Sequence, residues 1–331
     1  MAASSLILIG ASAGGIPAVI RLIEQLPGSL PAAVLVVQHL APGIDGGSLA
    51  ARLDRHTPLS CHLAQGGEAV ENGHLYLAPP DQHLLVEGSH LTVTFGAREN
   101  RFRPAVDALF RSAAVEWGRK TTGVILTGML HDGTTGMECI RRCGGHSVVQ
   151  DPNDAEYPSM PASAMKAGAD YVIPVSKMGS LLLKLATRMS METDANGSIP
   201  EDLRREAAIA RRVLAGADDV APLGSPAQIS CPDCGGGLWE MAHGEVLRYR
   251  CHTGHAFSGD YLLELGQRNL EESLWVALRI MEEQRLLLSR LASRGEAYYG
   301  TSQEERLEEI KKHIHRLRAY LAGEPDPVAG Q

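Results

Sequence analysis

The first 189 residues alternate between short runs of consecutive apolar residues and longer segments whose apolar residues recur every three or four positions. The short runs are followed by glycine or polar residues, which is typical of strands buried on both faces of a parallel sheet. The longer segments have the spacing of helices with one buried face. This alternation predicts an α/β fold with a doubly wound, mostly parallel, Rossmann-like sheet over residues 1–189. The strand runs are residues 6–9, 33–37 and 123–126, and the helical segments are 16–26, 104–117 and 176–189.

Three shorter runs between residues 75 and 95 alternate apolar and polar positions more strictly. They are Leu75–Leu77, Leu84–Val86 and Leu91–Phe95. Alternation of this kind favours strands with one solvent-exposed face. We therefore expect a hairpin-rich insertion in this part of the chain.

The remainder of the chain divides by composition. Residues 190–228 are rich in Asp, Gly, Ser and Pro around one short charged helical segment, so we expect a linker there. Residues 229–258 hold a cluster of cysteines and histidines, which predicts a small zinc-ribbon-like module. Residues 259–331 contain two amphipathic segments, 260–293 and 303–321, which predict a helical hairpin followed by a tail.

The two amphipathic segments allow two interpretations. They form a hairpin that packs on itself or on the cysteine module, or they form the interface of a homodimer. The heptads are too few for a committed coiled coil, so packing within the chain is the favoured interpretation.

The composition excludes several classes of protein. The chain has 331 residues, which corresponds to about two domains, and 44% hydrophobic and 21% charged residues are ordinary for a globular protein. The net charge is −8 and no strong basic patch stands out, so no nucleic-acid partner is expected. No apolar run approaches the ~18 residues of a membrane span, and the first residues lack the features of a signal peptide. We therefore expect a cytoplasmic protein.

A serine in a glycine-rich turn follows the first predicted strand. The segment Gly10-Ala-Ser12-Ala-Gly14-Gly15 fits G-x-S-x-G, which presents a serine on a sharp strand-to-helix turn. The helix that begins near Ile16 directs its dipole at this turn and would favour a developing anion. The alternative is a phosphate-binding loop, but the spacing differs from G-x-G-x-x-G and no acidic residue ends the second strand.

A histidine and an aspartate follow two other predicted strands. His39 ends Val-Val-Gln-His, and Asp132 lies in Leu-Thr-Gly-Met-Leu-His-Asp-Gly. Taken singly, each is more often structural than catalytic. Together with Ser12 they lie past the carboxyl ends of parallel strands, where sites assemble in open α/β sheets. A serine nucleophile needs a base, and the base needs a carboxylate, so the three residues predict a Ser-His-Asp triad.

The second half of the chain contains a metal-ligand pattern. Cys231-Pro-Asp-Cys234 is followed after sixteen residues by Cys251-His-Thr-Gly-His255. This spacing predicts a zinc ribbon in which Cys231, Cys234, Cys251 and His255 are the ligands. His252 is the alternative fourth ligand, but it adjoins Cys251 and would strain the chelate. Four protein ligands close the site, so we expect a structural zinc ion and no cofactor for catalysis.

Seven motifs cover nearly the whole of the first 189 residues. They are G-A-S-A-G-G at 10–15, V-V-Q-H at 36–39, Y-L-A-P-P-D at 76–81, R-P-A-V-D-A-L-F-R-S-A-A at 103–114, L-T-G-M-L-H-D-G at 126–133, V-V-Q-D-P at 148–152 and Y-P-S-M-P-A-S-A at 157–164. With these motifs in the expected order, the segment closely resembles the catalytic domain of the chemotaxis protein-glutamate methylesterase family (CheB-like).

The resemblance implies roles for these residues. Ser12 is then the nucleophile, His39 the general base and acid, and Asp132 the residue that orients His39. The backbone amide of Met129 helps to bind the oxyanion. The implied reaction is hydrolysis of glutamate γ-methyl esters on a methylated chemoreceptor or similar signalling protein with release of methanol. Deamidation of protein glutamines is implied as a side activity.

Two departures from the family pattern bear on regulation and substrate contact. The chain begins at the first catalytic strand, so we expect a stand-alone form without a receiver domain and with a C-terminal zinc-ribbon-like segment. Ala13 follows the nucleophile where many relatives have threonine. The alternative function is a non-enzymatic signalling adaptor that uses the esterase fold and the zinc module to bind proteins. The intact triad favours the enzyme.

Overall fold

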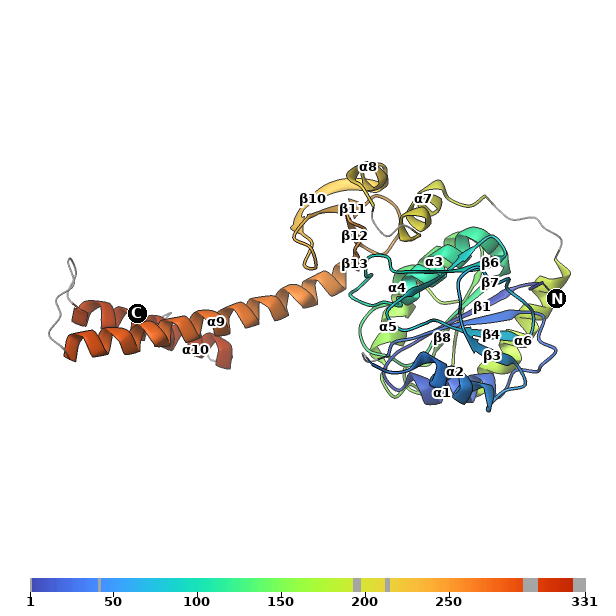
Figure 1. Ribbon diagram of the computed structural model, residues 1–331, viewed down its shortest axis with the longest axis horizontal. Helices are drawn as coiled ribbons and strands as arrows, with labels where there is room; N and C mark the ends of the chain where they lie inside the picture. Colours follow the sequence, from blue (N-terminus) through green and yellow to red (C-terminus); the bar gives the residue numbers. More distant parts are fainter. Residues whose placement is uncertain (1, 41–42, 193–197, 212–214, 294–302, 324–331) are drawn as a thin grey trace. The chain divides into compact units, whose positions relative to one another are not determined.

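A computed structural model describes residues 2–40, 43–192, 198–211, 215–293 and 303–323. The chain divides into two compact units, residues 1–261 and 262–331, and each is described by itself. Figure 1 shows the order of the elements along the chain.

The core of the first unit is a parallel sheet of seven strands in the order β3-β4-β2-β1-β7-β8-β9. Alternate residues of its central strand β1 point to opposite faces: Leu6 and Leu8 join one apolar core, and Ile7 and Ile9 join the other. The first core is covered by α3, α4 and α5, and the second by α1, α2 and α6. The predicted doubly wound α/β fold is therefore confirmed. The elements are β1 (Leu6–Ala11), α1 (Gly15–Ile23), β2 (Ala33–Gln38), α2 (Gly46–Asp54), β3 (Ser60–Leu63), β4 (His74–Leu77), α3 (Val106–Trp117), the 3₁₀ helix η1 (Gly118–Lys120), β7 (Thr121–Ile125), α4 (Thr134–Arg142), β8 (His146–Gln150), α5 (Ser159–Lys166), β9 (Tyr171–Ile173) and α6 (Val175–Met191).

The expected hairpin-rich insertion is smaller than its sequence pattern indicates. Only β5 (His83–Glu87) and β6 (His90–Thr94) form an antiparallel hairpin. The first of the three runs lies in β4, which pairs in parallel with both β2 and β3. The prediction was wrong for this strand because both of its faces are buried: Leu75 and Leu77 enter one apolar core, and Tyr76 enters the other. The hydroxyl of Tyr76 is satisfied there by the amide of Glu71 and the carbonyl of Ala69.

Residues 198–261 pack against the parallel sheet and its helices. They contain α7 (Glu201–Ala210), α8 (Ala217–Val220), the 3₁₀ helix η2 (Ala221–Leu223) and an antiparallel sheet of four strands. Leu203 of α7 enters the apolar core beside α3. We call residues 224–258 the ribbon module; its strands are β10 (Gly224–Ser230), β11 (Gly237–Met241), β12 (Arg248–Cys251) and β13 (Ala256–Ser258). The domain boundaries given above stay predictions.

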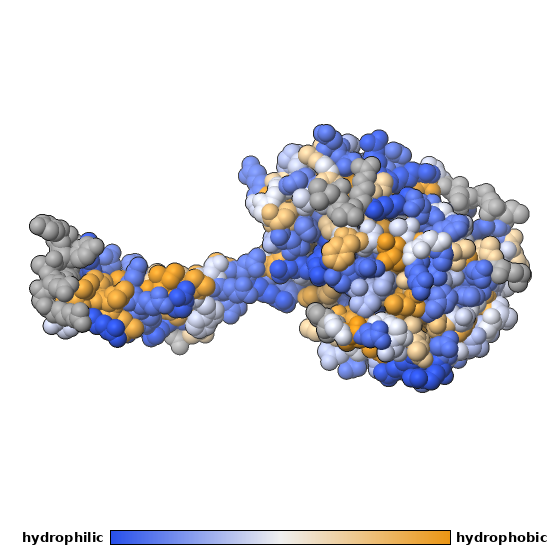
Figure 2. Space-filling view, in the orientation of Figure 1, coloured by the Kyte–Doolittle hydropathy of each residue, from blue (hydrophilic) through white to orange (hydrophobic). Residues whose placement is uncertain are grey.

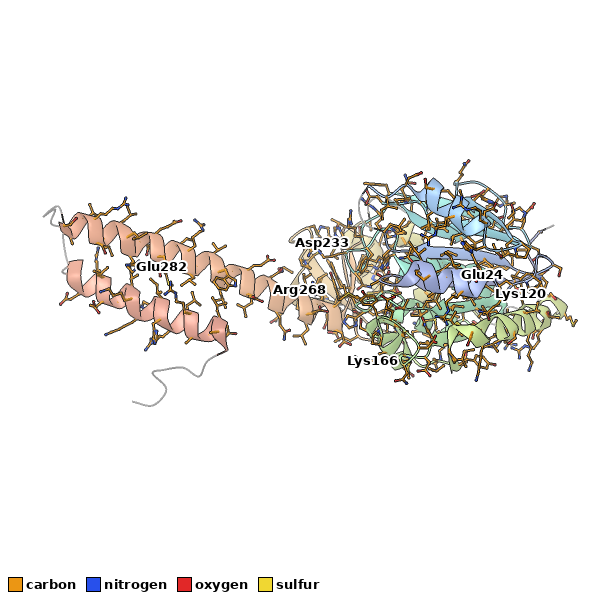
Figure 3. The ribbon with its side chains drawn as sticks, turned by 90° about the horizontal axis from the view of Figure 1, so that it is seen from below. Glu24, Lys120, Lys166, Asp233, Arg268 and Glu282 are labelled. Atoms are coloured by element: carbon orange, nitrogen blue, oxygen red, sulfur yellow. The ribbon has the colours of Figure 1, made fainter. Side chains whose placement is uncertain are left out.

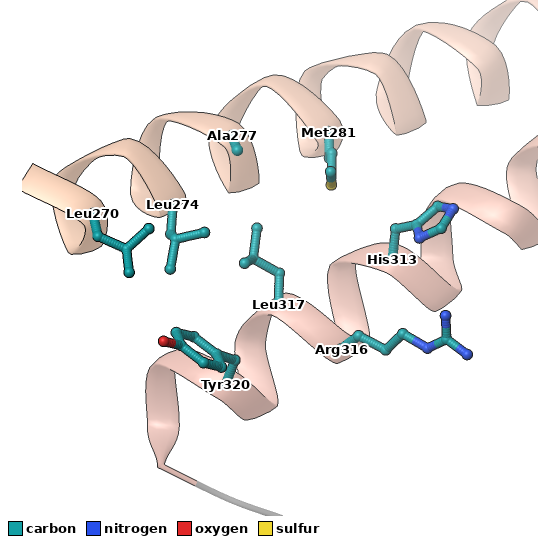
Figure 4. Close-up of a pocket in the computed structure, with 8 residues that line it drawn as sticks. All are labelled: Leu270, Leu274, Ala277, Met281, His313, Arg316, Leu317 and Tyr320. Carbon is teal, nitrogen blue, oxygen red and sulfur yellow. The ribbon is translucent and has the colours of Figure 1, made fainter. Parts of the chain in front are cut away.

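The second unit consists of α9 (Gly259–Ser293), whose first residues belong to the first unit, and α10 (Gln303–Ala322). The two helices run antiparallel, because Leu270 lies near Tyr320 and Leu291 lies near Arg306. An apolar groove of about 530 Å³ lies between them (Figure 4). Figure 2 shows further apolar side chains on the surface of this hairpin. In Figure 3, Glu282 of α9 points toward α10, where it binds Arg318.

The homodimer stays a prediction. None of the described helices is long and apolar enough to cross a membrane.

Candidate active site

Ser12 and His39 each follow one of two neighbouring parallel strands. Ala11 of β1 is paired with Gln38 of β2, so the next residue of each strand reaches the same sheet edge. The amide of His39 donates to the carbonyl of Ala11 at 3.0 Å. The side-chain amide of Gln38 donates to the carbonyl of Ser12 at 2.8 Å. These bonds fix the two strand ends side by side.

The turn after Ser12 requires glycine. Gly14 has φ +68°, in the left-handed region that side chains disfavour. A Cβ atom on Gly15 would lie 2.2 Å from Oε1 of Gln38. The two glycines therefore let α1 begin directly behind the serine.

His39 and Asp132 are in direct contact. Nε2 of His39 lies 2.8 Å from Oδ2 of Asp132, and their side chains are 7% and 0% exposed. Asp132 also accepts from the amides of Val106 at 2.7 Å, Gly133 at 3.1 Å and Asp107 at 3.2 Å. Two of these amides open α3. The carboxylate is therefore removed from water but supplied with donors, which is the condition under which a buried charge is tolerated.

This contact selects one histidine tautomer. Because Nε2 faces the carboxylate of Asp132, it carries the proton and Nδ1 is left as the basic nitrogen. In the described part of the chain, Nδ1 of His39 is buried and has no hydrogen-bond partner. No hydrogen bond joins Ser12 to His39 within those same residues. The structure thus joins two members of the predicted triad and positions Ser12 at the adjoining strand end.

The loop after β7 passes close to Ser12. A Cβ atom on Gly128 would lie 2.9 Å from Cβ of Ser12. Met129 follows Gly128 in this loop and is 52% exposed. Two hydrogen bonds hold the loop. The amide of Gly128 donates to the carbonyl of Tyr157, and the amide of Leu130 donates to the hydroxyl oxygen of Ser159.

Phe102 is a site residue that sequence reasoning missed. Its ring stacks on the His39 ring with centroids 3.8 Å apart and planes 5° apart. Both rings line a cavity of about 580 Å³. Arg98, Arg101 and Arg103 line it as well. No periodic pattern marks Phe102, because it lies in a turn far from His39 in sequence.

Asp107 is a second buried carboxyl group that sequence reasoning missed. It accepts from the amides of Gly133 at 3.0 Å and Gly136 at 2.7 Å, and from the side chain of Asn100 at 3.0 Å. Burial, followed by the charge of Asp132, raises the pKa of Asp107 to about 7. Asp107 supports the loop that carries Asp132, because both carboxyl groups bind the amide of Gly133.

The four predicted metal ligands lie together in the ribbon module. Their ligand atoms all lie within 4.8 Å of one another. Nδ1 of His255 is 3.5 Å from Sγ of Cys251 and 3.8 Å from Sγ of Cys231, and Sγ of Cys234 is 3.9 Å from Sγ of Cys251. Tetrahedral zinc with ordinary bond lengths gives edges of about 3.8 Å between sulfurs and about 3.5 Å between sulfur and nitrogen. The residues present therefore fit a zinc ion.

His252 is not part of this group. Its ring meets the ring of Trp239 edge-on at 6.5 Å and lies beside Gly236. Of the two histidines considered from the sequence, the geometry favours His255.

A parallel sheet that presents a serine and a carboxylate-bound histidine at adjacent strand ends is the architecture of α/β enzymes that use an activated serine. A model of the CheB methylesterase family matches residues 7–182, which include Ser12, His39 and Asp132. The chain belongs to the CheB methylesterase family.

Several relatives are named for this activity. The protein-glutamate methylesterase/protein-glutamine glutaminase of Thiobacillus denitrificans is 41% identical over 54% of this chain and 51% of its own length. The corresponding protein of Symbiobacterium thermophilum is 38% identical over 54% of this chain and 50% of its own length. A putative protein-glutamate methylesterase/protein-glutamine glutaminase of Leptospira interrogans serovar Lai is 38% identical, and the match covers 93% of it. The chain thus spans about half the length of the first two relatives.

A solved structure supports the fold. The CheB methylesterase catalytic domain of Thermotoga maritima is 37% identical, with a TM-score of 0.52, over 55% of this chain and 98% of that domain.

Proposed function

We propose that this protein hydrolyses γ-methyl esters of glutamate on a chemoreceptor-like protein, with release of methanol, and that it deamidates glutamines of such proteins as a second activity. The observation that carries the proposal is the contact between His39 and Asp132, with Ser12 at the adjoining strand end of a CheB-family domain. The names of the relatives support the same substrate class.

In the proposed reaction, Oγ of Ser12 attacks the ester carbonyl while Nδ1 of His39 takes its proton. Asp132 accepts from Nε2 of His39 and stabilises the imidazolium that forms. The backbone amide of Met129 donates to the oxyanion. The tetrahedral intermediate then collapses, and methanol leaves with the proton from His39. A water molecule, activated by the same nitrogen, hydrolyses the acyl-enzyme and releases the glutamate carboxylate.

The cavity beside His39 suits an acidic protein surface. Three arginines line it. Two of them share Asp81, the acidic residue that lines the cavity in the described part of the chain, and Arg101 pairs with Asp233, so a net positive charge is left. Acidic side chains that flank the ester would therefore be attracted to this cavity. The proposed place of action is the cytoplasm, in keeping with the family to which the chain belongs.

A methanol-release assay on a methylated receptor tests the proposal. The protein should release methanol, and Ser12→Ala should release it about 10⁴-fold more slowly or slower still. Ser180→Ala, on the exposed side of α6, is the matched control and should behave like the parent protein. If the parent protein binds the receptor without releasing methanol, the adaptor is the better description.

A further inference from the structure

We propose that a zinc ion bound by Cys231, Cys234, Cys251 and His255 holds the catalytic histidine in position through the turn formed by residues 98–103. We call this segment the bridging turn. That His39 is catalytic rests on the proposed esterase function, but the effect of zinc on the position of His39 can be tested without that activity.

The ribbon module binds the bridging turn next to the metal ligands. The amide of Asn100 donates to the carbonyl of Ala256 at 2.7 Å, and Ala256 follows the ligand His255. Nε of Arg101 lies 3.1 Å from Oδ1 of Asp233, which lies between Cys231 and Cys234 in sequence. Each contact is one residue away from a ligand in sequence, so ordering of the ligands by zinc is transmitted directly to the turn.

A third bond closes the contact between the turn and the module. The amide of Ser258 in β13 donates to Oδ1 of Asn100 at 3.0 Å. Asn100 is thus bound through both its backbone and its side chain, and it is 2% exposed. A residue held in this way has one position relative to the ribbon module.

The backbone of the bridging turn needs this support. Asn100 has φ +48° and Arg101 has φ +64°. Two consecutive residues with side chains in the left-handed region are uncommon, and such a conformation persists only where the surroundings impose it. The ribbon module binds the two residues that have this conformation, whereas Glu99 and Arg103 on either side of them pair with Arg111 and Asp81 outside the module.

The same turn reaches the catalytic residues by two routes. Phe102, bound to Glu99 across the turn through both backbone groups, stacks on His39. The side-chain amide of Asn100 donates to Asp107, which binds the amide of Gly133 beside Asp132. Phe102 and Asn100 are therefore positioning residues: they act through His39 and Asp132 and do not take part in bond making.

Zinc content and its consequence are measured on the full-length protein. We expect one zinc ion per chain by elemental analysis after purification without chelator. Cys234→Ser should lose the ion, whereas Cys61→Ser, a cysteine of β3 outside the ribbon module, should retain it. Protein without zinc that takes up none when the metal is supplied would overturn the proposal.

The position of His39 is read directly by nuclear magnetic resonance. With histidines labelled with ¹³C and the His39 signal assigned by its loss in His39→Gln, its ring protons should show the ring-current shift of the stacked Phe102. The shift should be lost in Phe102→Leu, kept in Phe102→Tyr, and lost on removal of zinc. A His39 signal that does not respond to zinc removal contradicts the inference, whether or not the protein is an esterase.

Activity gives the second measurement. Asp233→Asn leaves all four ligands in place and should retain zinc, yet it weakens the tie to Arg101. We expect kcat for ester hydrolysis to fall by about tenfold or more with little change in KM, since small displacements of a catalytic group have effects of this size. Asp218→Asn, an exposed aspartate of α8, is the control. Unchanged kcat in both Asp233→Asn and Phe102→Leu would refute the positioning role.

The two sets of outcomes separate the two proposals. If the zinc-loaded protein releases no methanol but His39 still responds to zinc, the esterase function fails and the structural inference stands. If methanol is released at the same rate with and without zinc and His39 does not move, the inference fails and the esterase function stands.

Discussion

The parallel sheet and the ribbon module belong to one compact unit but are held by different interactions. Strands β1 and β2 are buried along their whole length and are almost entirely apolar. Between the ribbon module and the rest of the unit, six charged side chains of the described residues are at most 5% exposed. Five of them pair with one another: Glu99, Arg111, Glu206, Arg248 and Arg250. The sixth, Glu138, accepts from the amides of Glu245 and Val246.

Because of this difference, the apolar core determines how stable the unit is, and the charged contact determines how the ribbon module is oriented on it. Apolar residues of similar volume can often be exchanged, because burial is not directional. A buried charge that loses its partner is costly, so the five paired charges favour the arrangement in which each has an ion-pair partner. Arg250 binds both Glu99 and Glu206, at 3.1 and 3.0 Å. The sheet provides a stable frame for the active site, and the charged contact fixes where the ribbon module lies against it.

The largest effect on activity should come from replacing the proposed nucleophile, Ser12, at the end of β1. Ser12→Ala should lower kcat for methanol release by about 10⁴-fold or more, because the attacking group is lost. Circular dichroism and thermal unfolding should stay close to those of the parent, since Ser12 is only partly buried. Turnover near the parent value would remove Ser12 from the mechanism.

The choice of histidine gives the next largest effect. His39→Gln should lower kcat by about 10³-fold or more, because the base that accepts the serine proton is lost. His131→Gln should have a much smaller effect, because Nδ1 of His131 lies 2.8 Å from Oγ of Ser163, whereas the carboxylate of Asp132 is in contact with His39. The reverse order of the two variants in the methanol assay would show that the wrong histidine has been assigned.

The charged contact can be broken at one residue. Glu206→Gln removes the partner of Arg248 and one partner of Arg250, at 2.8 and 3.0 Å. Unpaired buried charges of this kind lower the free energy of unfolding by about 3–5 kcal/mol. Urea unfolding monitored by circular dichroism measures this loss. Glu201→Gln, whose exposed carboxylate pairs with Arg205, should change the free energy little. Equal stability of the two variants would mean that the contact is not closed in solution.

Acid should weaken the charged contact selectively. Burial alone would raise the pKa of Glu99, but the charges of Arg111 and Arg250 lower it to about 2. Because this pKa is lower in the folded state, ionised Glu99 adds to the free energy of unfolding when the pH is above the ordinary pKa of 4.5. This contribution is lost as the pH falls through about 2. Urea unfolding at several pH values below 5 should therefore show a loss of stability that is smaller in Glu99→Gln than in the parent.

A second effect of pH on stability should have the opposite sign. The pKa of Asp107 is raised to about 7 in the folded state. Protonated Asp107 therefore contributes fully to the free energy of unfolding when the pH is below the ordinary pKa of 3.8, and this contribution is lost as the pH rises through about 7. Asp107→Asn should remove this part of the pH dependence of unfolding between about pH 4 and 7. The loss of stability below pH 5 that is due to Glu99 should remain. Unchanged dependence in this window would show that Asp107 does not titrate there.

The apolar part of the molecule could be predicted from the sequence, and the charged part could not. Continuous apolar runs identified β1, β2 and β7, and the residues that follow them include Ser12 and His39. The spacing of the cysteines and histidines singled out, without any knowledge of the fold, four residues whose ligand atoms lie together in the ribbon module. Glu206 and Arg250 resemble surface residues in sequence, since their burial depends on partners distant along the chain. Phe102 was missed for the same reason.

The close approach of Gly15 to Gln38 restricts how this family can vary. The side chain of Gln38 joins the two strand ends through Ser12 and occupies the space where a Cβ atom of residue 15 would lie. A mutation of either residue is therefore expected to depend on the other. Gly15→Ala should be tolerated better beside a shorter residue at position 38, and lineages that have lost the glycine should have replaced the glutamine as well.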